Sequence, residues 1–287
     1  MSDLLLTLLL GTMQGGLYTL VGLGLTITFG VTHILNFAHG EFVTLGAFAF
    51  IIVAGSAGVL AALPVALLIA ALAAGLLYLV GFIRTIGDHL QGLAFSMGVL
   101  LLTENLFLEF FSANPRTGPR VEGMMALPGG EQIAWSRVIV IIATAAIVIG
   151  SAFAMKRSWV GLALRATGDD RFAASTLGLS ARRIGLYAFL VAAVFAGVAG
   201  ICIASVSPVT PTIGVSFLLT GFVVVIIGGL GSPEGVLMAS MILGILEALV
   251  SRYIDPSMTM VYTFAAMIVV LLVMPQGLFN RKVVRAG

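Results

Sequence analysis

The chain has 287 residues, of which 60% are hydrophobic and only 9% are charged, and its formal net charge is +2. A soluble globular domain carries about 25% charged residues, so this composition excludes such a domain and indicates a chain that lies largely in a lipid bilayer. With no basic patch that alternates with aromatic residues, the small positive charge gives no reason to expect a nucleic-acid partner.

A helix that spans a bilayer needs about 20 apolar residues, and nine stretches of the sequence approach this length. In chain order they are Leu4–Phe29, Phe42–Leu60, Leu63–Ile83, Leu93–Phe111, Val138–Phe153, Ile184–Val206, Val215–Leu230, Val236–Val250 and Met258–Met274. Several are short, and short apolar helices either tilt little or end inside the membrane. The sequence therefore predicts an all-α polytopic membrane protein with about eight to ten transmembrane helices, some of them broken or short near a substrate path. Because no polar segment is long enough to form a core of its own, residues 1–287 are expected to form a single transmembrane domain.

Polar groups follow the first apolar stretch, in the segment "ILNFAHGEF" (Ile34–Phe42). An ionisable group at membrane depth costs about 2.5 to 3.5 kcal/mol, and irregular backbone is tolerated there only where it is buried in protein or lines a cavity. We therefore predict that Asn36, His39, Gly40 and Glu41 form a helix break beside the substrate path. Hydrogen bonds within the protein are expected to hold the Glu41 carboxylate, and direct contact of this segment with substrate stays open.

Three further carboxylates lie in apolar stretches. Glu104 and its neighbour Asn105 are central in theirs, which favours a place along the substrate path. Glu109 is one turn from the end of the same stretch and can reach the lipid headgroups. Glu247 could pair with Arg252 or serve helix packing.

Basic residues gather in three segments that alternation of the spans can place on one side of the membrane. These ten of the 14 Lys and Arg residues are Arg84, Lys156, Arg157, Arg165, Arg171, Arg182, Arg183, Arg281, Lys282 and Arg285. Loops rich in Lys and Arg stay in the cytoplasm, so Arg84, the loop 155–183 and the C-terminal tail are predicted to be cytoplasmic. The segment Ser112–Ser136 then faces outward, and the side of the N-terminus stays open.

The cytoplasmic loop 155–183 contains a short helical pattern over Arg171–Leu179, which Gly178 can end and which Asp169 or Asp170 can cap. A short helix on the cytoplasmic face is suited to docking a partner protein. An ordinary solvated loop is the alternative interpretation.

Two distant segments resemble each other, Thr28–Phe48 and Ile226–Gly244. Each places a glycine-rich break and a glutamate just before a helix with many small residues. The pattern is consistent with a degenerate internal repeat, as many transporters have, although glycine-rich turns between membrane helices look alike in any case.

Several chemistries have no support in the sequence. There is no G-x-x-x-x-G-K-[ST] motif, so ATP hydrolysis would require another chain. His33, His39 and Glu41 do not share a helix face, and His89 is in a loop, so we expect no metal site. No serine or cysteine lies in a recognisable nucleophile motif, so we expect no catalytic residue and no cofactor in this chain. The single cysteine, Cys202, excludes an internal disulfide.

Three motifs together resemble one family. "LNFAHGEFVTLGAF" resembles the N-terminal signature of LivH-type permeases, the membrane subunits of branched-chain amino acid ABC importers. "FAASTLG" (Phe172–Gly178) keeps the spacing of the importer loop motif E-A-A-x-x-x-G, with Phe172 in the glutamate position. "IIGGLGSPEGVLMASMILGILEA" looks like the C-terminal stretch of the family. The sister LivM-type subunit usually reads closer to N-L-G-x-G at the first motif, so "NFAHGE" favours the LivH type.

This resemblance implies a multi-pass permease subunit in the bacterial inner membrane that imports branched-chain or other small hydrophobic amino acids. It also implies a LivM-like sister permease, two cytoplasmic ATPases of the LivG and LivF types, and a periplasmic substrate-binding protein. On this basis the residues that couple the permease to the ATPases are Arg165, Ala173, Ala174 and Gly178.

Two other functions stay open. Relatives of the family import urea, short amides or other small organic solutes, which the sequence does not separate from amino acids. An ion-coupled secondary transporter could use Glu41, Glu104 and Glu247 as a proton relay. A membrane enzyme is disfavoured because no nucleophile or metal set is present.

Overall fold

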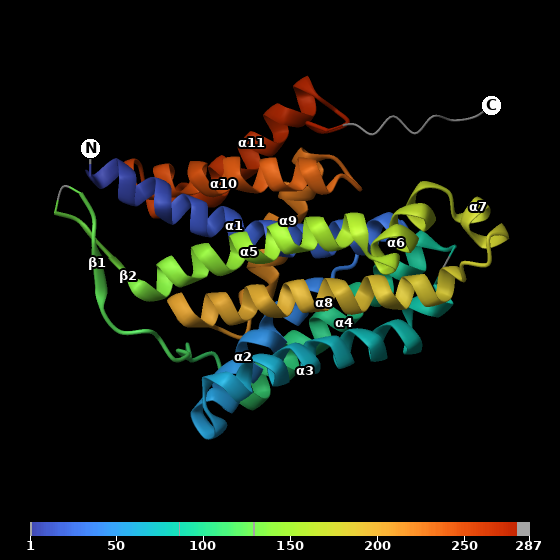
Figure 1. The fold of residues 1–287 in the computed structure, drawn as a ribbon, viewed down its shortest axis with the longest axis horizontal. Helices are drawn as coiled ribbons and strands as arrows, with labels where there is room; N and C mark the ends of the chain where they lie inside the picture. Colours follow the sequence, from blue (N-terminus) through green and yellow to red (C-terminus); the bar gives the residue numbers. More distant parts are fainter. Residues whose placement is uncertain (1, 86, 129, 280–287) are drawn as a thin grey trace.

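The computed structural model describes residues 2–85, 87–128 and 130–279, and helices dominate this part of the chain (Figure 1). The elements are α1 (Ser2–Thr32), α2 (His39–Ala57), α3 (Val59–Val80), η1 (Phe82–Arg84), α4 (His89–Phe111), β1 (Met124–Ala126), β2 (Gln132–Ala134), α5 (Trp135–Arg157), α6 (Trp159–Asp169), α7 (Arg171–Thr176), α8 (Ala181–Val206), α9 (Ile213–Gly228), α10 (Pro233–Tyr253), η2 (Pro256–Met258) and α11 (Thr259–Val273). The basic tail residues Arg281, Lys282 and Arg285 lie outside the described ranges.

Among the described residues, eight helical segments are long and apolar enough to cross a membrane. They are Asp3–Thr32, His39–Ala57, Val59–Arg84, His89–Phe111, Trp135–Arg157, Ala181–Val206, Pro233–Tyr253 and Pro256–Val273. The ninth predicted stretch, Val215–Leu230, corresponds to α9, which has only 16 residues. The prediction of an all-α polytopic membrane protein is therefore confirmed, and one of its apolar helices is short.

Small residues allow α1 and α10 to pack closely. A Cβ atom at Gly15 of α1 would lie 2.9 Å from the Ser240 carbonyl oxygen of α10, and one at Gly11 would lie 2.8 Å from Cα of Ile245. The hydroxyls of Thr19 and Ser240 are 2.5 Å apart in the same interface. Lipid provides no hydrophobic drive between helices, so such close contacts and hydrogen bonds hold them together.

Helix α3 packs against α2 and α8 through a stripe of alanines. The buried residues Ala62, Ala66, Ala70 and Ala74 recur at intervals of four, which places them on one helix face. Leu63, Leu68 and Leu72 between them are exposed, as a surface against lipid requires. The alanines of α3 therefore face the neighbouring helices, and its exposed leucines face lipid.

The two ends of the helix bundle differ. Helices α6 and α7 lie at one end of the long axis, and the β1–β2 hairpin lies at the other (Figure 1). The Tyr78 hydroxyl donates a 2.8 Å hydrogen bond to the Arg182 carbonyl, which places the end of α3 beside the start of α8 at the α7 end. Asp3 pairs with Arg252 at 2.6 Å near the hairpin end. The predicted grouping of Arg84 with the loop 155–183, away from Ser112–Ser136, is therefore confirmed.

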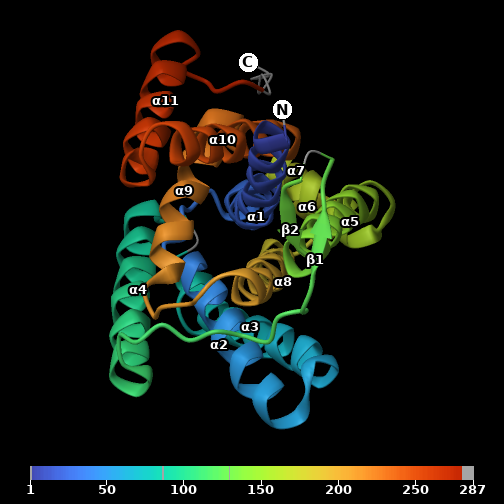
Figure 2. The same ribbon diagram turned by 90° about the vertical axis from the view of Figure 1, so that its left-hand side faces the viewer.

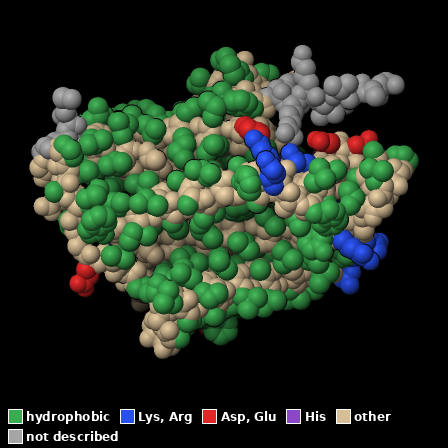
Figure 3. Space-filling view, viewed as in Figure 1, with side chains coloured by type: hydrophobic (Ala, Val, Ile, Leu, Met, Phe, Trp, Pro, Cys, Tyr) green, Lys and Arg blue, Asp and Glu red, His purple; other side chains and the backbone are tan. Residues whose placement is uncertain are grey.

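Hydrophobic side chains cover most of the face shown in Figure 3, and the Lys and Arg side chains visible there lie in the half that carries α6 and α7. Viewed from the hairpin end, α1, α5 and α8 are seen nearly end-on, whereas α9 runs across the view (Figure 2). The short helix α9 is thus steeply inclined to the long helices around it.

Candidate functional site

The helical structure is interrupted between α1 and α2, as the sequence predicts. The Asn36 side-chain oxygen accepts a 3.0 Å hydrogen bond from the Ala38 backbone N–H, and its carbonyl accepts one of 3.2 Å from His39. An asparagine that bonds to the backbone two residues ahead forms a turn. Asn36 therefore forms the turn from which α2 begins.

The start of α2 lies beside the middle of two long helices. His39 is fully buried, and a Cβ atom at Gly24 of α1 would lie 2.5 Å from Cε1 of its ring. The same Cβ would lie 3.1 Å from the Ala192 carbonyl oxygen of α8. The imidazole thus occupies space between α1 and α8 that Gly24 leaves open.

The first turn of α2 also meets the first turn of α9. A Cβ atom at Gly40 would collide with the Gly214 carbonyl, and one at Gly214 would collide with the Gly40 carbonyl and the Thr44 hydroxyl. Phe37, just before α2, packs edge-on against Phe222 of α9 with ring centroids 5.1 Å apart. Two helix starts, one of them following the predicted break, therefore meet inside the bundle.

We call the region where the starts of α2 and α9 meet the junction. Several polar side-chain atoms in it have no hydrogen-bond partner among the described residues. They are Asn36 Nδ2, both His39 ring nitrogens, both Glu41 carboxylate oxygens and Thr44 Oγ1. Glu41 is 1% exposed, so the predicted hydrogen bonds that would hold its carboxylate within the protein are wrong. Buried polar groups normally find partners, and a group of unpartnered ones marks a candidate binding site.

Helix α4 brings only one of its two predicted residues to the junction. Glu104 is half-buried and close enough to Glu41 for an electrostatic interaction between the two carboxyl groups. Asn105 is exposed and donates a 2.7 Å hydrogen bond to the Leu101 carbonyl of its own helix. Glu109, near the end of α4, is exposed as predicted.

Glu247 belongs to a different cluster. It accepts hydrogen bonds from Tyr18 of α1 at 2.5 Å and from Thr263 of α11 at 2.7 Å. Arg252 pairs with Asp3 instead, so the predicted alternative of a Glu247–Arg252 pair is wrong. The three carboxylates suggested as a relay are therefore divided, with Glu41 and Glu104 together and Glu247 in a separate network.

The helix predicted in the loop 155–183 is α7. Its N-cap is Asp170, whose carboxylate accepts a 2.9 Å hydrogen bond from the Ala173 N–H, whereas Asp169 ends α6. Gly178 has a φ of 82°, and Leu179 donates a 3.1 Å bond to the Ala174 carbonyl. This left-handed glycine ends the helix as the sequence predicts.

Not all of the residues predicted to couple the permease to the ATPases lie on the surface of α7. Ala173 and Gly178 are exposed, but Ala174 is only 3% exposed and packs inside the chain. Phe172 and Leu177 are 80% and 81% exposed, which is unusual for large apolar residues. No feature of the sequence marks these two side chains as contacts. Arg165 of α6 is half-buried, and its Nε has no hydrogen-bond partner among the described residues.

His33 lies between α1 and α2, near α7 and the start of α4. The His89 Nδ1–H donates a 2.9 Å hydrogen bond to the His33 carbonyl. Partial burial, and then the charges of Arg171 and His89, hold the pKa of His33 below its ordinary value of 6.5. The His33 imidazole is therefore neutral at pH 7.

The two segments compared as a repeat have the same order of elements. Thr28–Phe48 contains the end of α1, a break and the start of α2, and Ile226–Gly244 contains the end of α9, a break and the start of α10. Glu41 and Glu234 both lie in the first turn of the second helix. The contact of Gly40 with Gly214 was not predicted, because it joins residues that are distant in the sequence and share no motif.

Comparisons with known proteins point to one family. The model described as "Branched-chain amino acid transport system / permease component" matches residues 7–271. The high-affinity branched-chain amino acid transport system permease protein LivH of Salmonella typhimurium is 28% identical over 94% of each chain. BraD of Pseudomonas aeruginosa, a permease protein of the same description, is 26% identical over 94% of each chain. LivM of Escherichia coli is 30% identical over 91% of this chain and 67% of its own length. No solved structure matches.

Proposed function

Since the chain belongs to the family of branched-chain amino acid transport system permease components, we propose that it is the LivH-type subunit of an ATP-driven importer of branched-chain or other small hydrophobic amino acids. The family match carries the proposal, because it runs from α1 into α11 and includes the junction, α6 and α7. Relatives named as permease proteins support a transport subunit that is not itself an enzyme.

The junction of α2 and α9 is the proposed substrate path. Helix N-termini carry partial positive charge and favour anionic groups, and two such ends meet where Gly40 contacts Gly214. The Asn36 amide nitrogen, the His39 ring and the Glu41 carboxyl group provide hydrogen-bond donors and acceptors beside them. A zwitterionic amino acid is a suitable passenger for such a site.

A LivM-like sister permease is the proposed cover of α4. The chain resembles both LivH and LivM relatives, which supports a pair of related permeases. Helix α4 is mostly exposed, yet it carries Glu104 near its middle. Glu104 is only half-buried, and a carboxylate that is partly exposed to lipid at this depth is costly, so a second protein subunit is the better neighbour for this face.

Two cytoplasmic ATPases, LivG-like and LivF-like, are the proposed partners of α6 and α7. Phe172 and Leu177 offer an apolar contact beside Ala173 and Gly178, and Arg165 offers a cation. The chain itself has no P-loop, so the nucleotide would bind to the partners. The proposed location is the bacterial inner membrane, and residues 1–287 form a single permease domain in it. The substrate-binding protein would dock at the hairpin end.

Amino acids are favoured over urea and short amides because the relatives described above are all named for branched-chain amino acid transport. An ion-coupled mechanism is disfavoured, since Glu247 is separated from Glu41 and Glu104 in its own hydrogen-bond network. The glutamates therefore do not form the single cluster that the relay hypothesis suggested.

Uptake in cells tests the proposal. A bacterial strain that lacks its own branched-chain uptake is given the complete set of importer subunits, with or without this chain. Labelled leucine should accumulate only when the chain is present, and excess isoleucine or valine should compete. Accumulation of labelled urea or acetamide in place of leucine would assign the chain to the other solutes.

A further inference from the structure

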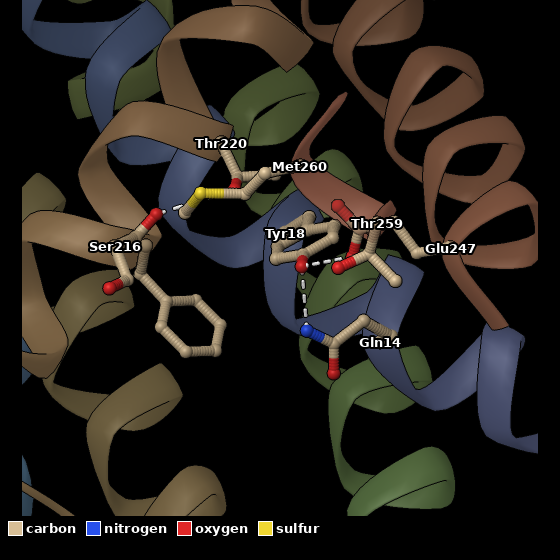
Figure 4. A pocket seen from close by; sticks show the side chains of 8 residues that line it. Gln14, Tyr18, Ser216, Thr220, Glu247, Thr259 and Met260 are labelled. Atoms are coloured by element: carbon tan, nitrogen blue, oxygen red, sulfur yellow. Dashed lines mark hydrogen bonds between the residues drawn. The ribbon is translucent and has the colours of Figure 1, made fainter. Parts of the chain in front are cut away.

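A polar cavity that is open on one side lies apart from the junction, between α1, α9, α10 and α11 (Figure 4). Its volume is about 200 Å³, which is room for about six or seven water-sized groups. Glu247 and Tyr18 lie close together on one side, and Ser216 and Thr220 of α9 lie on another (Figure 4). The cavity can therefore hold a small organic molecule in contact with a carboxylate.

Both carboxylate oxygens of Glu247 accept hydrogen bonds from neighbouring helices. The Gln14 side-chain nitrogen can only donate, and it donates a 2.7 Å bond to the Tyr18 oxygen. The one hydroxyl proton of Tyr18 then goes to Glu247 Oε2, while Thr263 donates to Oε1. Both carboxylate oxygens accept hydrogen bonds, as an ionised carboxylate does.

The Glu247 carboxylate forms no ion pair in the part of the chain that the structure describes. Arg252, the cation nearest in sequence, is bound to Asp3. No Lys, Arg or His of the described residues forms an ion pair with Glu247. A carboxylate inside a membrane bundle is normally paired, so the missing partner is expected to come from a ligand.

The cavity lining indicates the class of ligand. The hydroxyls of Ser216, Thr220 and Thr259 can accept hydrogen bonds beside the carboxylate, and Phe217 and Met260 add apolar surface. An ammonium group has three donors and no acceptor, which suits this set of oxygens. Within the described residues, no three His, Cys, Asp or Glu side chains come together as metal ligands do.

We propose that this cavity binds the ammonium group of a small aliphatic amine, with Glu247 as its counter-charge, Tyr18 and Thr263 orienting the carboxylate, and Phe217 and Met260 contacting the apolar part. The proposal rests on the proposed function in one respect, because the amine of interest is then an aliphatic amino acid. Helix α9 borders both this cavity and the junction, through Ser216 and Thr220 on one side and Gly214 on the other.

Ligand-induced stabilisation of the complete transporter complex in lipid nanodiscs tests this site. The probes are leucine, 3-methylbutylamine, which is leucine without its carboxylate, and 4-methylpentanoate, which lacks the ammonium group. Leucine and 3-methylbutylamine should raise the Tm of the unmodified complex, and this rise should depend on Glu247. Any rise with 4-methylpentanoate, whose carboxylate suits the junction, should not depend on Glu247. Glu247→Gln should require at least about tenfold more amine for the same shift, because one charge contact is lost.

Glu109→Gln is the matched control, since it removes an exposed carboxylate of α4 and should leave the response to amines unchanged. Thr220→Val keeps the volume of a buried cavity residue and should weaken amine binding about threefold or more, through the loss of a hydrogen-bond acceptor. This second variant keeps the Glu247 carboxylate and its hydrogen bonds from Tyr18 and Thr263. It therefore keeps the test decisive if Glu247→Gln does not assemble.

Several results would overturn the assignment. One is an unchanged amine response in Glu247→Gln or, if that variant does not assemble, in Thr220→Val. Another is stabilisation by sodium chloride but not by the amines. The third is no stabilisation by leucine or by 3-methylbutylamine. Loss of the response in Glu41→Gln alone would move the ammonium site to the junction. Leucine uptake separates the two proposals. If leucine is taken up but amine binding does not depend on Glu247, only the proposed amine site is contradicted. If amine binding depends on Glu247 but leucine is not taken up, only the proposed transport function is contradicted.

Discussion

Gly40 and Gly214, the second residues of α2 and α9, are in direct backbone contact, since a Cβ atom on either would collide with the carbonyl of the other. This contact joins the break after α1 to the start of the short apolar helix. It brings two helix N-termini, Glu41 and the unpartnered Asn36 amide nitrogen into one region. The close approach of α2 and α9 at the proposed path therefore requires glycine at positions 40 and 214.

Gly40→Ala should destabilise the protein by about 1 to 3 kcal/mol, because the added methyl group overpacks the contact with Gly214. Leucine uptake should fall with it, since α2 and α9 must move apart. The thermal midpoint of the purified complex and uptake in cells are the two measurements.

Gly55→Ala on the same helix is the matched control, because a Cβ atom there meets nothing within 4 Å. It should leave stability unchanged or raise it by up to about 1 kcal/mol through better helix propensity. Equal behaviour of the two alanine variants would contradict the close junction.

Glu41→Gln should raise the free energy of unfolding by about 1 kcal/mol while it lowers leucine uptake. The Glu41 carboxyl group is buried without a hydrogen-bond partner among the described residues and lies close to Glu104. Both features make its ionisation costly, and the amide of Gln avoids this cost because it cannot ionise. Thermal unfolding and uptake should therefore move in opposite directions. A variant that is less stable than the unmodified protein would show that Glu41 has a stabilising partner.

Phe172→Ala and Leu177→Ala should each uncouple transport from ATP hydrolysis, by about tenfold or more, because large apolar side chains in a protein interface contribute about 2 kcal/mol when they are anchors. Phe153→Ala is the control, since Phe153 is also a large exposed residue but belongs to α5, outside α6 and α7. Leucine-stimulated ATPase activity of the reconstituted complex is the measurement. Normal stimulation in both α7 variants would remove α7 from the proposed docking surface.

Ser175→Cys, in a chain whose only cysteine has been replaced by Cys202→Ala, should react with an impermeant thiol reagent only in opened membranes. Thr117→Cys, in the segment at the hairpin end, should react in intact spheroplasts, because both positions are exposed in the structure and lie at opposite ends. The reverse pattern would invert the predicted orientation.

His33→Asn should make stability less dependent on pH between about 7 and 5. The pKa of His33 lies below 6.5 in the folded protein, so the unfolded chain binds more protons in this range and folding weakens as the pH falls. Asparagine tolerates the φ of 57° at this position and cannot take up the proton. Thermal midpoints at the two pH values, with and without the substitution, measure the effect.

The break and the spans could be predicted because they depend on local patterns. Asn36 forms the expected turn, and Asp170 and Gly178 bound α7 as their residue types suggest. The short length of α9 was also visible as a short apolar stretch. In each case the signal lies within a few neighbouring residues.

Contacts between distant helices could not be predicted in the same way. Nothing near Gly214 in the sequence identifies Gly40 as its neighbour, and Tyr18 has no local feature that points to Glu247. The expected hydrogen bonds to Glu41 were inferred from the cost of a buried charge, but the described residues supply none. Ala174 matched the coupling motif, yet the packing of α7 turns it inward and exposes Phe172.

Leucine uptake by the complete complex reconstituted in proteoliposomes tests the central claim most directly. With the substrate-binding protein outside and ATP inside, labelled leucine should accumulate against its gradient, and it should do so when proton and sodium gradients are abolished by ionophores. A non-hydrolysable ATP analogue should stop it. Accumulation that needs an ion gradient and proceeds without ATP would contradict the assignment of this chain to an ATP-driven importer.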